Sequence, residues 1–265
     1  MGGMLALEWC LLFGKNYVQS IIMISSTARQ SPWAIAWAET QRASVESDPN
    51  YRDGCYGDNP PRAGLAAARM AAMISYRSHS SFEKRFERRR LDDQALLKLG
   101  GKSKQIRAAE ARRDGHHRDD SGIFLAQGYI RYQGDKFNRC FDANCYIHIL
   151  DKIDTHDVSR GRYPQLSDAE AMRKVLGQIQ QQALVIGISS DGLYPIELQT
   201  YIAENIPNAT FASVRSDDGH DGFLLEGGQV NDLFHWFFNE YPLGEKSSYP
   251  QEKTGMSMMT VNLVN

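Results

Sequence analysis

Apolar residues in this chain gather in short continuous runs or recur at helical spacing, and the two patterns predict different elements. Three runs read as buried parallel strands: residues 18–25, 183–188 and 210–214. Helical spacing occurs from residue 1 onward and in four later stretches: residues 64–76, 121–151, 195–204 and 230–239. Strands that alternate with helices in this order predict an α/β fold, a parallel sheet with helices packed on it.

The pattern between the first two strands is mostly helical, which predicts a cap inserted into the sheet-bearing core. We expect four segments: a first part of the core (residues 1–31), a helical cap (32–180), a second part of the core (181–245) and a tail (246–265).

A charged stretch at residues 83–120 interrupts the cap and contains a basic run at residues 84–90 and the pair His116 and His117. A nucleic-acid patch or a metal site is conceivable there. However, acidic residues are interleaved with the basic ones, and adjacent histidines point apart on a helix. We therefore interpret this stretch as a solvated or disordered insert.

Composition excludes several classes of function. A net charge of -2 over 265 residues gives no general attraction to nucleic acid or to an anionic membrane, and no apolar run reaches membrane-spanning length. The four cysteines show neither a CxxC pair nor histidines at metal spacing, so reduced thiols in a cytoplasmic protein, without a metal site, are expected.

Two strand-end motifs carry candidate chemistry. Asp191 follows the predicted strand 183–188, and His220 follows the next strand, so both are expected at the carboxyl edge of the sheet. An acid followed by a histidine is the order of the last two catalytic-triad members in α/β-hydrolases, where the histidine removes a proton from a serine hydroxyl. The alternatives are a helix-capping aspartate and an ordinary Gly-His-Asp turn.

The start of the chain bears on this choice. A helix that begins at Met1 without a capping residue, and without the features of a signal peptide, suggests that an upstream segment is missing. The nucleophile elbow G-x-S-x-G lies between a strand and a helix, and Met1-Gly2 fits its last two positions. The catalytic serine would then stand directly before Met1.

With these motifs the chain resembles the homoserine O-acetyltransferases, which carry Gly-Gly-Ser-Met-Gly-Gly at the elbow. The other matching segments are residues 26–33, 37–42, 129–137, 141–146 and 154–157, together with Asp-Gly-Leu-Tyr-Pro at 191–195 and Gly-His-Asp-Gly-Phe-Leu at 219–224. The resemblance covers most of residues 1–242. It implies a partial α/β-hydrolase fold that comprises the C-terminal strands of the sheet and the inserted cap.

The resemblance also implies roles for individual residues. Asp191 and His220 match the triad acid and base, and the backbone N–H of Met1 matches an oxyanion-hole donor. Arg69 matches the residue that binds the substrate carboxylate, Asp221 the one that takes the substrate amino group, and Tyr76 a tyrosine of the same pocket. A zwitterion such as homoserine needs one cation and one anion in its site, and a guanidinium can bind a carboxylate in bidentate fashion.

The implied reaction is a ping-pong transfer of acetyl from the co-substrate acetyl-CoA to homoserine in methionine biosynthesis, with no bound cofactor. A homodimer formed through the cap is implied as well. Without the serine, the 265-residue chain is expected to be inactive alone. The alternatives are serine or another acceptor, another acyl donor, and a non-catalytic chain: a truncated gene model, a pseudoenzyme or one half of a split protein.

Overall fold

The protein is described by a computed structural model that covers residues 1–90 and 124–242. It divides into two compact units, which are described separately. The sheet unit comprises residues 1–36, 75–78 and those from 151 onward, and the helical unit comprises residues 37–74 and 79–150.

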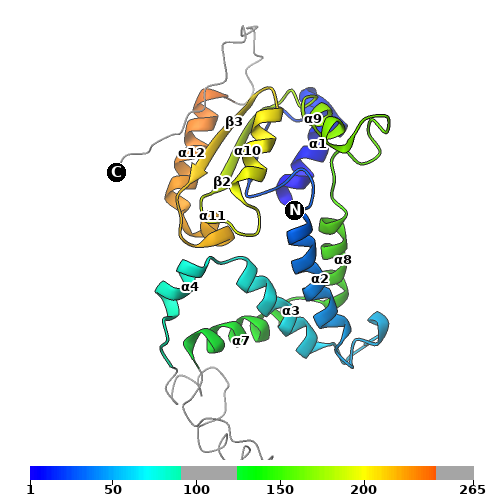
Figure 1. Cartoon of the computed structure of the whole chain (residues 1–265), viewed down its shortest axis with the longest axis vertical. Helices are drawn as coiled ribbons and strands as arrows, with labels where there is room; N and C mark the ends of the chain where they lie inside the picture. The colour runs from blue at the N-terminus through cyan, green and yellow to red at the C-terminus, as the bar shows by residue number, and fades with distance from the viewer. Residues whose placement is uncertain (91–123, 243–265) are drawn as a thin grey trace, which may run out of the picture. The chain divides into compact units, whose positions relative to one another are not determined.

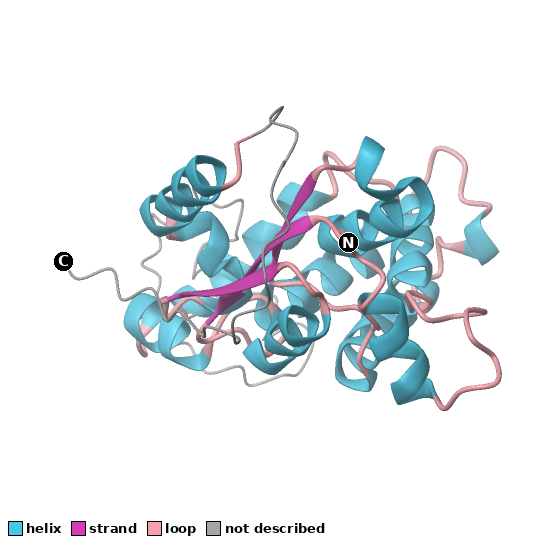
Figure 2. Ribbon diagram, turned by 90° about the horizontal axis from the view of Figure 1, so that it is seen from above, coloured by secondary structure: helices cyan, strands magenta, loops and turns pink. Residues whose placement is uncertain are grey.

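The sheet unit is built on three parallel strands in the order β1-β2-β3. They are β1 (Ser20–Ile24), β2 (Gln182–Ile188) and β3 (Ala209–Val214). Leu184 of β2 pairs with Ile22 of β1 on one side and with Thr210 of β3 on the other. Figure 2 shows the three strands side by side. The parallel sheet predicted from the three apolar runs is thereby confirmed, with strand bounds that differ from the predicted ones by at most two residues.

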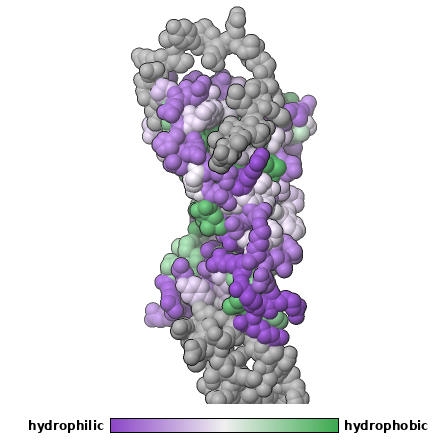
Figure 3. All heavy atoms as spheres, turned by 90° about the vertical axis from the view of Figure 1, so that its left-hand side faces the viewer, coloured by the Kyte–Doolittle hydropathy of each residue, from purple (hydrophilic) through white to green (hydrophobic). Residues whose placement is uncertain are grey.

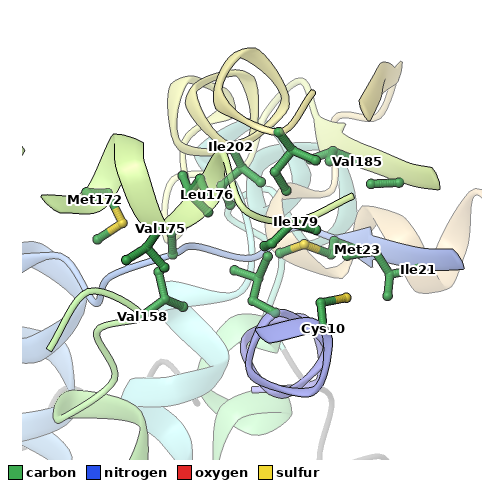
Figure 4. Packing of buried hydrophobic residues seen from close by; sticks show 14 residues of the cluster. Cys10, Ile21, Met23, Val158, Met172, Val175, Leu176, Ile179, Val185 and Ile202 are labelled. Carbon is green, nitrogen blue, oxygen red and sulfur yellow. The ribbon is translucent and has the colours of Figure 1, made fainter. Parts of the chain in front are cut away.

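Helices cover both faces of this sheet (Figure 1). One face carries α1 (Gly2–Tyr17), α9 (Asp168–Leu176) and α10 (Ile196–Asn205), and the other carries α12 (Gly227–Glu240). Side chains of a strand point alternately to its two faces. Val185 of β2 accordingly packs with the first group of helices (Figure 4), whereas Leu184 and Ile186 pack with α12. This alternation explains why β2 carries no polar side chain from Ala183 to Ile188.

Helix α1 carries apolar residues on two opposite faces. Met4, Leu7 and Cys10 are buried toward the sheet. The opposite face carries a stripe of exposed apolar residues: Met1, Leu5, Trp9, Leu12, Phe13 and Tyr17. Within the described residues, β1 beside this helix pairs with β2 alone. Exposed apolar stripes of this size are unusual on folded monomers.

The helical unit contains α2 (Pro32–Glu46), α3 (Arg62–Ser75), α4 (His79–Phe86), α7 (Leu125–Phe137) and α8 (Ala143–Asp154), of which α2, α3 and α8 extend into the sheet unit. A 3-10 turn, η1 (Arg52–Gly54), lies between α2 and α3. The core of the helical unit includes Val45, Leu65 and Tyr146, which come from α2, α3 and α8. Asp48 accepts a hydrogen bond from the Gly64 N–H at 2.8 Å, which satisfies one of the free amides at the start of α3.

Three sequence-based boundaries differ from the structure. The predicted helical stretch 121–151 is two helices, because Asp142 accepts the Cys145 N–H at 2.9 Å and so begins α8 as a new helix. The cap was predicted to end at residue 180, but α9 packs into the core of the sheet through residues such as Val175. Finally, the predicted insert begins with a packed element, since Phe86 is buried and its ring lies 5.0 Å from that of Tyr129.

The rest of the predicted insert, residues 91–120, lies outside the described residues, and so do its histidines His116 and His117. Among the helices that the structure does describe, none is long and apolar enough to cross a membrane. The four cysteines are unpaired. Figure 3 shows one face of the molecule, on which the described residues are mainly hydrophilic and the hydrophobic ones form small separate groups.

Candidate active site

Asp191 lies in the turn after β2, where its side chain is fully buried. Its Oδ1 atom accepts two backbone hydrogen bonds, from Leu193 at 2.9 Å and from Tyr194 at 2.8 Å. Its Oδ2 atom lies 2.7 Å from Nδ1 of His220. Because one oxygen is held by two amides, the other oxygen is fixed in its orientation toward the imidazole.

His220 lies in the short 3-10 turn η2 (Gly219–Asp221) that follows β3. The N–H of Gly219 donates to Oγ of Ser190 at 2.9 Å, which ties this turn to the turn that carries Asp191. Among the residues that the structure describes, the carboxylate of Asp191 is the hydrogen-bond partner of the His220 ring. The Nδ1–carboxylate contact favours the tautomer in which Nε2 carries no proton, so Nε2 can act as a base.

Three aromatic rings surround His220. The ring centroids of Tyr194, Phe223 and Tyr76 lie 5.4, 5.5 and 5.9 Å from that of the imidazole. Burial raises the pKa of Tyr194 to about 12, so this phenol stays neutral near pH 7, and it donates to Gln30 at 3.2 Å. The rings therefore position His220 without adding charge.

The amino end of α1 lies at the same edge of the sheet as Asp191 and His220. The backbone of Gly3 packs so closely on Ser26, just past the end of β1, that an added Cβ atom would lie 2.7 Å from the Ser26 Cβ atom. Asp191 follows β2 and His220 follows β3, and the carboxyl ends of parallel strands share one edge. Met1 begins α1 there, with its carbonyl oxygen accepting the Leu5 N–H at 3.0 Å.

The remaining predicted site residues fall into two groups. Tyr76 and Asp221 lie in the sheet unit beside the pair of Asp191 and His220, which we call the dyad, and the N–H of Asp221 donates to the carbonyl of Tyr76 at 3.1 Å. Arg69 belongs to α3 in the helical unit, and its guanidinium lies 4.9 Å from the ring centroid of Phe137.

One charged residue near the dyad was not predicted from the sequence. The side chain of Arg77 is 7% exposed and forms ion pairs with Asp218 at 3.0 Å and with Asp221 at 3.7 Å. Acidic residues flank His220 in the sequence and indicate that a cation is needed there, but no sequence pattern indicates that Arg77 supplies it.

Gly219 provides a direct test of how tightly the turn of His220 is built. Its φ is +71°, and an added Cβ atom would lie 2.7 Å from the Ser78 nitrogen. Gly161 also has a φ of +71° but has open space around it, so it is a matched control. We expect Gly219→Ala to destabilise the protein by roughly 3 kcal/mol, because strain and a backbone clash add together, and Gly161→Ala to cost about 1–2 kcal/mol. Urea unfolding of both variants measures the difference, and equal losses would show that the close approach carries no energy.

Comparison with known proteins gives a consistent set of relatives. The profile of the α/β-hydrolase fold family matches residues 1–227. A homoserine O-acetyltransferase from Emericella nidulans is 42% identical over 91% of the chain, and one from Fusarium oxysporum f. sp. lycopersici is 44% identical over 91% of it. The chain spans 59% and 67% of the lengths of these two relatives.

Among solved structures, a homoserine O-acetyltransferase from Bacillus anthracis superposes with a TM-score of 0.72 at 16% identity. The match covers 90% of this chain and 57% of the chain of that structure. At this identity the likeness concerns the fold, which agrees with the parallel sheet and the helices on its two faces.

Proposed function

The chain belongs to the homoserine O-acetyltransferase family of the α/β-hydrolase fold, and on this premise we propose that it carries the acid–base residues of an enzyme that acetylates L-homoserine. The observation that carries the proposal is the 2.7 Å contact between Nδ1 of His220 and a buried carboxylate oxygen of Asp191. Such a pair serves a hydroxyl nucleophile.

We propose that this nucleophile is a serine placed directly before Met1, outside the 265 residues. In the first step, Nε2 of His220 takes the serine proton while Oγ attacks the acetyl carbonyl of acetyl-CoA. The C–S bond then breaks, and the imidazolium returns the proton to the CoA thiolate. In the second step, His220 takes the homoserine hydroxyl proton, the homoserine oxygen attacks the acyl-serine, and the proton passes to the departing serine oxygen.

The backbone at Met1 has its own proposed role. In a nucleophile elbow, the N–H of the residue after the serine donates to the oxyanion. Met1 would occupy that position, and the amino end of α1 lies at the correct edge of the sheet.

Substrate recognition is proposed to rest on opposite charges. Arg69 would bind the carboxylate of homoserine, Asp221 would bind its ammonium group, and Tyr76 would line the pocket. L-Serine carries the same two charges, so it remains the alternative acceptor, and competition between the two amino acids in one assay distinguishes them. We also propose a cytoplasmic location. In addition, we propose a homodimer formed through the cap, and analytical ultracentrifugation can test whether the chain dimerises.

The proposed function predicts that the nucleophile must be added for activity to appear. We expect no saturable acetyl transfer from acetyl-CoA to homoserine by the 265-residue chain alone. We expect transfer by a chimera in which the N-terminal part of a homoserine O-acetyltransferase, ending in the Gly-Gly-Ser of the family, precedes Met1. Release of CoA thiol, followed with a thiol reagent, measures both.

Two variants of the chimera serve as controls for this experiment. Replacing its final added serine by alanine, or His220→Ala in the chain, should each abolish transfer while circular dichroism and gel filtration remain unchanged. Activity in the chain alone, activity that survives the serine replacement, or a folded chimera without activity would each contradict the proposal.

A further inference from the structure

The turn that carries His220 is held from one side by the segment that directly follows α3, residues 76–78. This segment belongs to the sheet unit together with the dyad. The carbonyl of Tyr76 accepts the Asp221 N–H at 3.1 Å, and the Ser78 hydroxyl donates to the carbonyl of Asp217. Gly219 leaves no room for a side chain against this segment. The segment 76–78 thus contacts the backbone both before His220, at Asp217, and directly after it, at Asp221.

Arg77 is the central residue of this segment, and its side chain adds ion pairs to these backbone contacts. Its guanidinium reaches Asp218 two residues before His220 at 3.0 Å, and Asp221 directly after it at 3.7 Å. A guanidinium can bind two carboxylates at once because its N–H donors are arranged as a planar fork. With a side chain only 7% exposed, Arg77 is shielded from the water that weakens surface ion pairs.

We propose that Arg77 is a positioning residue that holds the turn of His220 in the conformation in which Nδ1 meets Asp191. Three aspartates lie in this turn or just before it, at positions 217, 218 and 221, and the buried carboxylate of Asp191 lies against the turn as well. Without the Arg77 guanidinium, repulsion between the carboxylates of Asp218 and Asp221 would open the turn and draw the imidazole away from Oδ2 of Asp191. The catalytic role of His220 in this inference rests on the proposed function, whereas the geometry of the turn does not depend on it.

A second consequence concerns Asp221, which is proposed to take the substrate ammonium group. Its Oδ2 atom faces Arg77 at 3.7 Å, so its orientation is set by a residue of the protein before any substrate arrives. Preorganised charged groups of this kind bind without a further ordering cost. Arg77 would then align both the base and the anionic end of the amino-acid site.

The test reads the geometry of the dyad in the 265-residue chain itself, without turnover. The chain is labelled with 15N-histidine, and the downfield proton of His220 Nδ1–H is assigned by its loss in His220→Gln. We expect Arg77→Met to abolish or broaden this resonance and to accelerate hydrogen exchange at the Gly219 and Asp221 amides by roughly tenfold or more. Arg77→Lys should have a smaller effect on both the resonance and the exchange rates, since lysine keeps the positive charge but lacks the planar fork of N–H donors.

Arg162→Met is the matched control, because Arg162 also forms an ion pair in the sheet unit, with Glu8 at 2.9 Å. It should leave the His220 resonance and the exchange of both amides as in the unchanged chain. If Arg77→Met does not fold, Asp218→Asn removes the shorter ion pair while the shape is kept, and faster exchange at Gly219 is expected from it.

An unchanged His220 resonance and unchanged exchange in a folded Arg77→Met variant, or in both Arg77→Lys and Asp218→Asn, would overturn the proposal. The result is separate from that of the activity assay. An inactive chimera with an intact resonance would count against the proposed function alone, whereas an active chimera unaffected by Arg77→Met, with an unmoved resonance, would count against the role of Arg77 alone.

Discussion

Asp191→Asn is expected to lower acetyl transfer by the chimera by roughly 10⁴-fold, the size of effect known for a catalytic imidazole held in the wrong tautomer. The two amides of Leu193 and Tyr194 that donate to Oδ1 of Asp191 would hold the asparagine carbonyl oxygen in that place. The asparagine NH₂ group would then face Nδ1 of His220 and donate to it. The ring proton would move to Nε2, which could no longer accept the proton of the serine.

Steady-state rates of CoA release measure this loss, and the NMR spectrum should lose the Nδ1–H resonance of His220 at the same time. Asp168→Asn is the control, because this carboxylate is 88% exposed and pairs with Arg29 away from the dyad. A rate within tenfold of the unchanged chimera for Asp191→Asn, with the protein folded, would mean that the acid does not orient the base.

The largest expected effect on stability comes from Phe237→Ala. Phe237 is fully buried between α12 and the sheet, where it packs with Leu184 and Ile186. Removal of the ring would leave a cavity against β2, and such changes cost about 3–5 kcal/mol. The midpoint of urea unfolding, followed by circular dichroism, measures this loss.

The adjacent Phe238 provides the matched control, since it lies on the same helix but is 41% exposed. Phe238→Ala should cost less than roughly 1 kcal/mol. Equal losses from the two changes would contradict the assignment of α12 as the cover of one face of the sheet.

The sheet could be predicted from the sequence chiefly because its central strand, β2, is buried on both faces. Leu184, Val185 and Ile186 alternate between two packed helix layers, so the run reads as continuously apolar. The break between α7 and α8 escaped prediction because it depends on one local hydrogen bond, which the Cys145 N–H donates to the Asp142 carboxylate and which hydrophobic spacing does not report. Similarly, the end of the cap is set by the packing of α9 into the core, a contact between distant segments.

For the candidate site, position along the strands was the informative signal. Asp191 and His220 each follow a strand, and parallel topology was enough to predict that they meet at one edge. Arg77 follows a helix and carries no strand-end signal, so only the folded chain brings it to Asp218. The proposed acceptor site combines Arg69 and Asp221, and only the family resemblance, not hydrophobic spacing or strand position, suggested these two residues.

The most direct test of the account is to locate the acetyl group on the enzyme before homoserine is added. The chimera is mixed with acetyl-CoA, quenched in acid, digested and mapped by mass spectrometry. We expect one acetyl group on the serine directly before Met1, and none on that serine in the His220→Ala chimera. An acetyl group on a different residue, or equal labelling with and without His220, would contradict it.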